Sequence, residues 1–301
     1  MNHMTEQKLD RGGVTAALAA FVFWGLVPIY YHALQSVGSW EVLAHRVIWS
    51  VPILLVFLAF RDGRQILRKL RLPLASIGWL VLSGLVISVN WLVFLWAVAH
   101  DNVLDTSLGY FGSPLVNVLL GYLVLKERMP PLQIIAIFVA AAGTIYFAWY
   151  LGRPPWIAIT LALSFGVYGL LRKRLDVGPM LGLLWETSLM FLPALVYLLW
   201  LSFQSSHHFL QGSTDIDLLL IGSGFATVLP LIWFNMAAKK LPLSILGFFQ
   251  YIGPCISFMV AVFLYNEQFT TGHAVIFSSV WIALALVSFE TFHRARRRQR
   301  V

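Results

Sequence analysis

The chain has 301 residues, of which 59% are hydrophobic and only 11% are charged. A water-soluble protein of this length needs more polar residues than this to cover its surface. The composition therefore excludes a water-soluble protein and indicates a membrane protein. The single cysteine, Cys255, excludes a disulfide framework and a thiolate metal cluster. Neither a metal nor any other cofactor is expected.

The apolar residues gather into ten segments. A helix needs about 20 apolar residues to cross a bilayer core about 30 Å thick. By this measure the sequence predicts ten membrane-spanning helices, at 12–35, 37–60, 75–98, 104–125, 132–150, 155–172, 179–201, 217–238, 243–265 and 273–292. The first is too long for the apolar core of a signal peptide and is expected to remain. Short connections and one loop from Ser202 to Asp215 make up the rest, so function is expected within the bundle.

Lysine and arginine lie almost entirely on one side of the predicted membrane. If the N-terminus is cytoplasmic, all but two of the 21 basic residues fall in the tails and in the cytoplasmic loops, as the positive-inside rule describes. The exceptions are Arg153 and Arg46, of which Arg46 lies within a span. Both termini are therefore predicted to be cytoplasmic. Membrane lipid, and not nucleic acid, is the expected partner of the arginine-rich tail.

The second half of the chain repeats features of the first. The matched stretches are 17–26 with 161–170, Trp40-Glu41 with Trp185-Glu186, and 108–111 with 246–249. Five helices in each repeat is an odd number, so the second repeat enters the membrane from the opposite side. The sequence thus predicts two inverted five-helix repeats, 1–150 and 151–301. Such repeats are typical of secondary transporters, which open one central site to either side alternately.

Several patterns of this chain occur together in one known family. They are Glu41-x-x-x-His45-Arg46-x-x-Trp49-Ser50, Asn90-Trp91, and the stretches 107–111 and 246–254. Over nearly its whole length the chain resembles the RarD group of the EamA family, in the drug/metabolite transporter (DMT) superfamily. The resemblance implies a five-plus-five helix bundle in a bacterial cytoplasmic (inner) membrane that exports small metabolites, with helices 132–150 and 273–292 at the periphery. Amino acids or related compounds are the expected substrates, and drugs are added by the link of the RarD name to chloramphenicol sensitivity.

Charged residues inside a span mark candidate sites, because a charge at the bilayer centre costs about 2.5–3.5 kcal/mol on insertion scales. Glu41 and His45 lie four residues apart on one helical face, with Arg46 beside them. Arg46 is predicted either to hold a substrate carboxylate, aided by Glu41 and His45, or to form a buried packing pair with Glu41. Glu186 has no basic residue within a turn, so it is the candidate proton carrier. The alternative for Glu186 is a structural hydrogen bond between helices.

Other polar and aromatic residues are expected to converge on one cavity. Trp24 and Tyr168 occupy matching repeat positions, each before a glycine, and are predicted to line the two halves of the site. The remaining candidates are Asn90, Trp91, Tyr110, Asn117, Asn235, Gln250 and Tyr251. Aromatic walls with a polar edge suit a metabolite that carries an apolar side chain. Interface belts and helix packing are the alternative for each aromatic residue.

Prolines within the spans are the candidate hinges. A proline inside a helix leaves a backbone carbonyl free and kinks the helix. The candidates are Pro28, Pro114, Pro230 and Pro254. The segments 104–125 and 243–265 carry related prolines, and interrupted helices of this kind mark the binding site in many transporters. Rigid packing kinks are the alternative.

Three other classes of protein fit the sequence less well. A membrane enzyme is disfavoured because the chain has no zinc-protease signature or phosphate-binding loop, and 222–224 only partly resembles an intramembrane serine protease motif. A channel is disfavoured because no stretch resembles a selectivity filter. A non-transporting structural or chaperone-like protein stays open as the alternative. The substrate, the direction, coupling to protons or exchange, and the oligomeric state are left open.

Overall fold

The computed structural model describes residues 10–65, 70, 72–126, 131–241 and 249–298. All regular elements of this part are helical. They are α1 (Arg11–His32), α2 (Ser39–Asp62), η1 (Gly63–Gln65), α4 (Leu74–Ala99), α5 (Val103–Leu125), α6 (Pro131–Leu151), α7 (Trp156–Arg174), α8 (Pro179–Phe203), α9 (Thr214–Lys240), α11 (Ile252–Met259), the π-helical η2 (Val260–Leu264) and α12 (Thr271–Arg298).

Eight of these helices are long and apolar enough to cross a membrane, and α7 and α11 with η2 are shorter apolar helices. The prediction of an all-α membrane protein is confirmed, and the ten predicted spans fit the described helices. The ninth prediction needs a correction, because residues 243–265 do not form one continuous helix. Phe249 is helical, Gln250 and Tyr251 form a turn, and α11 begins at Ile252. Residues 243–248 of that span lie outside the described part.

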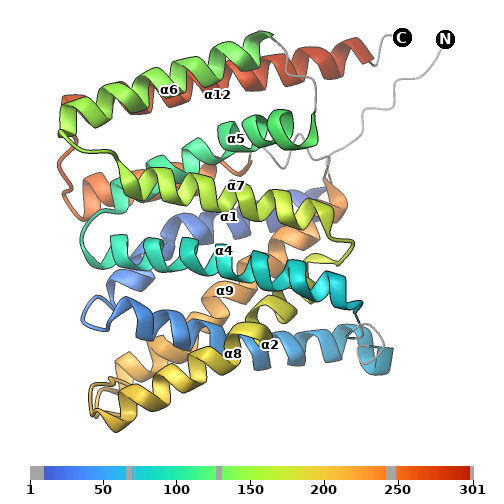
Figure 1. Cartoon of the computed structure of the whole chain (residues 1–301), viewed down its shortest axis with the longest axis vertical. Helices are drawn as coiled ribbons and strands as arrows, with labels where there is room; N and C mark the ends of the chain where they lie inside the picture. The colour runs from blue at the N-terminus through green and yellow to red at the C-terminus, as the bar shows by residue number, and fades with distance from the viewer. Residues whose placement is uncertain (1–9, 66–69, 71, 127–130, 242–248, 299–301) are drawn as a thin grey trace.

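The helices form a bundle with two distinct edges (Figure 1). Helices α6 and α12 pack along each other at one edge, and α2 and α8 pair at the opposite edge. The peripheral position expected for 132–150 and 273–292 is therefore the one that α6 and α12 occupy. α1 begins and α12 ends at the same end of the bundle (Figure 1).

Most of the helix packing joins the first half of the chain to the second. In the first half, α1 packs on α9 and α11 and α2 packs on α8 and α9. From the second half, α7 packs on α4 and α5 of the first half, and α8 also contacts α4. Apolar side chains fill these contacts. Lipid is as apolar as the helix surfaces, so the hydrophobic effect does not drive the helices together and van der Waals packing must hold the bundle. Neither half has a core of its own.

The candidate hinges are of two kinds. Pro28, Pro114 and Pro230 lie inside α1, α5 and α9. Pro254 lies in the first turn of α11, directly after the turn at Gln250 and Tyr251. At that position the missing N–H of proline costs no helical hydrogen bond, so Pro254 marks an interrupted helix and not a kink.

Candidate functional site

Arg46 lies in the second turn of α2 and faces two aromatic rings. Its guanidinium carbon is 4.1 Å from the ring centroid of Trp91 in α4 and 5.5 Å from that of Tyr31 in α1. Arg46 Nε is buried and has no hydrogen-bond partner. Among the described residues no carboxylate forms an ion pair with it. The Glu41–Arg46 ion pair, one of the two alternatives left open by the sequence, is therefore absent, and the Arg46 guanidinium lies against ring faces instead.

Two neighbours of Arg46 also have polar atoms without partners. The Tyr31 hydroxyl is buried and has no hydrogen-bond partner of normal geometry, although Thr227, which donates its own proton to the Ser223 carbonyl, lies nearby with an oxygen able to accept. His45 Nδ1 accepts from Trp49 Nε1 at 3.2 Å, so a neutral His45 carries its proton on Nε2. That Nε2 is buried and unpartnered as well. α2 and its neighbours thus bury three donors that have no hydrogen-bond partner of normal geometry.

Glu41 is bound by a segment far away in the sequence. Its carboxylate accepts from His208 N at 2.7 Å and lies 2.8 Å from His208 Nδ1. Glu41 is 2% exposed. Its carboxylate is thus used by His208, in the loop before α9, and by neither His45 nor Arg46. Sequence reasoning assigned no role to His208, because the loop from Ser202 to Asp215 carries no motif.

Glu186 is the centre of a polar cluster that joins three helices. Ser83 in α4 donates to its Oε1 at 2.6 Å, and Tyr168 in α7 donates to its Oε2 at 3.2 Å. Arg172 Nη1 lies 3.6 Å from Oε1. Sequence reasoning missed this basic partner because Arg172 belongs to α7 and reads as a residue of the cytoplasmic boundary. Arg172 also donates to the carbonyls of Val177 and Gly178.

The predicted repeat places Glu41 and Glu186 at matching positions, but the two residues lie at different distances from the starts of their helices. Glu41 is the third residue of α2, whereas Glu186 is the eighth residue of α8. The interior prolines Pro52 and Pro193 give nearly the same pairing as the helix starts. This pairing sets Arg46, and not Glu41, at the level of Glu186. The helix starts therefore do not support the expected correspondence of the two acids, which rests on a local sequence match.

Asn90 and Tyr110 lie near the Arg46 side chain but bind each other. The Tyr110 hydroxyl donates to Asn90 Oδ1 at 3.0 Å, and Asn90 Nδ2 donates to the Leu161 carbonyl and to Ser164 Oγ. Both amide protons of Asn90 are thereby used, and the side chain is 1% exposed. Asn90 joins α4, α5 and α7, as a buried amide must when no water can reach it.

The other candidates do not gather around Arg46. Trp24 packs against Phe21 and Phe234 at the contact of α1 and α9. Asn235 donates to the Leu231 carbonyl of its own helix. Asn117 and Gln250 are exposed, and Tyr251 is half-buried against the main apolar core.

The two glycines that follow Trp24 and Tyr168 differ in their packing. A Cβ at Gly25 would lie 2.6 Å from Ile256 Cβ and 2.9 Å from the Gly253 carbonyl, so α1 and α11 approach too closely for any side chain there. A Cβ at Gly169 would make an ordinary contact at 3.6 Å from Asn117 Oδ1. Close approach of a neighbouring helix therefore explains why residue 25 is a glycine, but it does not explain the glycine at residue 169.

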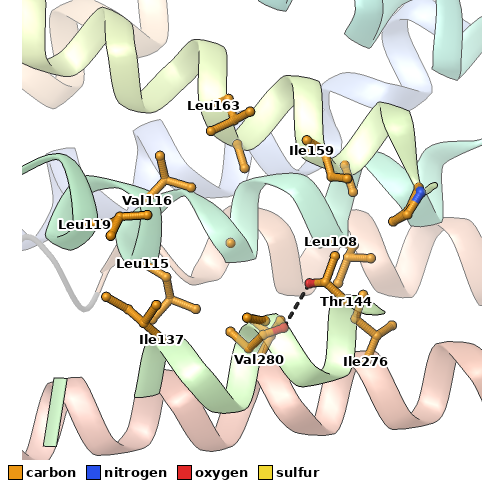
Figure 2. Close-up of a pocket in the computed structure, with 16 residues that line it drawn as sticks. Leu108, Leu115, Val116, Leu119, Ile137, Thr144, Ile159, Leu163, Ile276 and Val280 are labelled. Atoms are coloured by element: carbon orange, nitrogen blue, oxygen red, sulfur yellow. Dashed lines mark hydrogen bonds between the residues drawn. The ribbon is translucent and has the colours of Figure 1, made fainter. Parts of the chain in front are cut away.

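The larger cavity lies away from these polar residues. It measures about 220 Å³ and lies between α5, α6, α7 and α12. Figure 2 shows its apolar lining, in which the Thr144 hydroxyl is turned to the Ala140 carbonyl of its own helix at 2.9 Å. A second gap runs between Trp91 and Glu186 and has no room for a water molecule. The gap beside Trp91 and Glu186 is therefore closed in this conformation.

A many-helix apolar bundle with buried charges is the architecture of a multi-pass membrane transporter. The EamA-like transporter family model matches residues 11–149. An uncharacterised transporter of Vibrio cholerae is 41% identical over 300 residues, which are 98% of this chain and 99% of the relative. Protein RarD of Escherichia coli K12 is 39% identical, with 97% of this chain and 99% of the relative covered. The chloramphenicol-sensitive protein RarD of Pseudomonas aeruginosa is 30% identical, with 97% and 99% covered.

The chain belongs to the RarD group of the EamA family, in the DMT superfamily. The family predicted from the sequence patterns is thereby confirmed. The relatives are bacterial transporters, so this is a multi-pass protein of the bacterial inner membrane. A solved structure, described only as the crystal structure of a protein, has a TM-score of 0.60 and 16% identity, covering 92% of this chain and 97% of its own. That likeness shows the fold alone.

Proposed function

We propose that this protein is a secondary transporter that exports small metabolites, such as amino acids or related compounds, and drugs. Alternating access between two inverted repeats is the proposed mechanism, with the substrate bound near Arg46. The observation that carries the proposal is the half-buried Arg46 side chain, which has aromatic neighbours, a buried Nε without a hydrogen-bond partner and no ion-pair partner among the described residues.

The physical argument rests on what an unpaired buried cation costs. Burial of a charge without an ion pair is unfavourable by several kcal/mol. The rings of Trp91 and Tyr31 offset part of this unfavourable free energy, since a cation over an aromatic face gains about 0.5–2 kcal/mol. They cover the guanidinium faces and leave its N–H edge without a partner at Nε. A carboxylate binds a guanidinium edge-on through two parallel hydrogen bonds, so the missing partner is a substrate carboxylate.

The charge balance narrows the substrate class. Arg46 supplies one positive charge, and Tyr31 and His45 supply neutral donors nearby. A singly charged carboxylate neutralises this site, whereas a doubly charged phosphate leaves a net negative charge in a medium of low dielectric constant. Amino acids carry such a carboxylate together with an ammonium group that needs a separate partner, and the Trp91 ring offers an apolar wall to the side chain.

The pattern of helix packing supports the inverted repeats. Let α1, α2, α4, α5 and α6 correspond in order to α7, α8, α9, α11 and α12. The contact of α1 with α9 then corresponds to that of α7 with α4, and the contact of α1 with α11 to that of α7 with α5. The pairs α2 with α8, α5 with α11 and α6 with α12 each correspond to themselves. This is the packing expected of two halves related by an axis in the membrane plane, with both termini cytoplasmic.

Reconstitution into liposomes tests the proposal. Uptake of a labelled panel of amino acids and chloramphenicol is measured with and without a pH gradient, for the natural chain, Arg46→Ala and Arg46→Lys. Saturable uptake of a carboxylate-bearing compound, lost in Arg46→Ala and partly kept in Arg46→Lys, is the expected result. Uptake that is equal in all three proteins overturns the Arg46 site. No uptake of any compound favours a structural role.

Proton coupling is the part of the proposal that rests on Glu186. Its carboxylate is buried at the level of Arg46, and both of its oxygens already have partners. If Glu186 carries the coupling proton, Glu186→Gln transports at a rate that no longer depends on the pH gradient. Gradient dependence that persists in a folded Glu186→Gln protein assigns Glu186 to packing and leaves exchange or the substrate gradient as the driving force.

A further inference from the structure

The loop between α8 and α9 folds back over the beginning of α2. His208 binds the Glu41 carboxylate through both its backbone N–H and its ring, at 2.7 and 2.8 Å. The next residue, Phe209, lies with its ring centroid 4.8 Å from that of His45 and 6.2 Å from that of Trp49. Glu41 and His45 are 2% and 3% exposed. Two side chains near the start of a membrane-spanning helix are thus shielded from water by a loop.

The loop holds a defined shape of its own. Leu210 N donates to Asp217 Oδ1 at 2.7 Å, which ties the loop to the first turn of α9. Ser205 and Leu210 have φ angles of 52° and 61°. Non-glycine residues adopt this left-handed region at a cost and keep it only where surrounding contacts hold them. Residues 204–213 therefore form a docked element and not a slack connection.

These contacts join the two halves of the transporter at one end of the bundle. Glu41 and His45 belong to the first predicted repeat, and His208 and Phe209 belong to the second. A bundle that opens at this end by moving one half against the other must break every contact between them there. Two hydrogen bonds to a carboxylate and one ring contact suit that task, because water replaces such bonds at little net cost.

We infer that residues 204–213 are a lid that closes the extracytoplasmic end of the Arg46 site. Glu41 is the latch that holds the lid through His208, and Phe209 is the plug that covers His45. This role for Glu41 replaces the substrate contact predicted from its spacing to His45 and Arg46. The inference rests on the proposed function for what passes beneath the lid, but opening and closing are measurable without a substrate.

Cysteine labelling measures the opening. In a Cys255→Ser background, His45→Cys serves as a reporter, and a membrane-impermeant maleimide is added from the extracytoplasmic side. The reporter is expected to react about tenfold faster when His208→Ala is added, since loss of a hydrogen bond to a charged group shifts an equilibrium by about that factor. It is also expected to react faster when Phe209→Ala is added, because the ring that covers this position is removed. The matched control is His207→Ala, which removes only a contact to Gln211 within the loop. Equal rates in all of these proteins overturn the lid.

A cross-link tests whether the lid must move. Glu41→Cys with His208→Cys, joined by a short bifunctional thiol reagent in the Cys255→Ser background, ties the lid to α2. Flux of the labelled amino-acid panel is expected to stop and to return on reduction. The control pair His207→Cys with Gln211→Cys is cross-linked within the loop and keeps its flux. Unchanged flux in the tied protein refutes a moving lid. No flux in the natural chain counts against the proposed function alone, and the labelling rates then still decide the lid.

Discussion

Two arginines lie inside the bundle, and their side chains have different kinds of partner. Arg172 extends from α7 to within 3.6 Å of the Glu186 carboxylate and donates to two backbone carbonyls at the start of α8, although its Nη1, like Arg46 Nε, makes no hydrogen bond. Arg46 has aromatic faces as its described neighbours and an unpartnered Nε. A cation that fixes helix packing is expected to be paired, because pairing offsets its desolvation. A cation that binds a substrate must be left with free hydrogen-bond capacity.

On the proposed function, Arg172 is a packing arginine and Arg46 is the ligand-binding arginine. Their sequence contexts do not separate them, since an acid lies near each along the chain, Glu41 five residues before Arg46 and Asp176 four residues after Arg172. Tertiary contacts do separate them, because Glu41 binds His208 and Glu186 reaches Arg172 from the next helix. Four changes test whether the division holds.

Arg46→Ala is expected to have the largest effect on transport. A substrate carboxylate bound by a guanidinium gains about 1.5–3 kcal/mol per charge-assisted bond, so apparent affinity should fall about 10- to 100-fold or more. The melting temperature is expected to stay or rise, because the variant no longer buries an unpaired charge. Binding of the best substrate of the panel and thermal unfolding in detergent are the measurements. A variant that unfolds early and binds normally would make Arg46 a packing residue.

Arg172→Ala is expected to have its main effect on stability and not on substrate binding. It leaves Glu186 buried without its basic partner, which costs about 3–5 kcal/mol of folding free energy. Adding Glu186→Gln to Arg172→Ala should recover part of the loss, because the amide carries no charge. Thermal unfolding of both single variants and of the double variant gives their coupling energy. Additive losses would show that the two side chains do not interact.

Gly182→Ala tests how Arg172 reaches its partner. A Cβ at Gly182 would lie 1.8 Å from Arg172 Nη1, so the guanidinium must move. The expected loss of stability is about 1–3 kcal/mol, as for other overpacked sites. Gly78→Ala in α4 is the matched control, because nothing lies within 4 Å of its added methyl group. Its stability should change by less than about 1 kcal/mol. Equal behaviour of the two variants would contradict the described path of Arg172.

Glu267 extends the comparison to an acid that has backbone partners in place of an arginine. Its carboxylate accepts from Val103 N and Leu104 N at 2.6 and 2.9 Å, in the connection between η2 and α12. Burial raises its pKa from 4.5 to about 7, although these two hydrogen bonds oppose the shift and Asp105 and Asp101 add to it.

The sign of the pH effect follows from the raised pKa. The folded state holds the Glu267 proton more tightly than the unfolded state, so its contribution to stability is complete below pH 4.5 and is lost as pH rises through about 7. Relative to Glu267→Gln, the natural chain should lose stability over this interval. The loss is expected to stay below about 2 kcal/mol, because the carboxyl is partly exposed. Unfolding of both proteins across this pH range measures it, and parallel curves would refute the shift.

Sequence reasoning identified the membrane class, nearly all spans and the family. The span predicted at 104–125 is α5 (Val103–Leu125), and the span predicted at 132–150 is α6 (Pro131–Leu151). These features are local, because the length and hydropathy of one segment decide whether it crosses a bilayer. The break at Gln250 and Tyr251 was missed, because the flanking residues are as apolar as in a continuous span.

The site was predicted only in part. Arg46, Glu186 and Trp91 were singled out from the sequence, and the structure places Trp91 against the Arg46 guanidinium, but their role as a substrate site stays a prediction. Tyr31 and His208 were not assigned, although both are adjacent to candidate residues in the structure. An aromatic residue in a chain with 22 Phe, 12 Trp and 10 Tyr gives little signal by itself.

The sequence by itself determined which segments enter the membrane, which charges enter with them and to which family the chain belongs. Only the tertiary structure decided how those charges are paired. His208 and Glu41 are 167 residues apart, and Ser83 and Glu186 are 103 residues apart. Such partners depend on the rotation and depth of each helix in the bundle. Packing between helices sets both of these, whereas hydropathy sets neither.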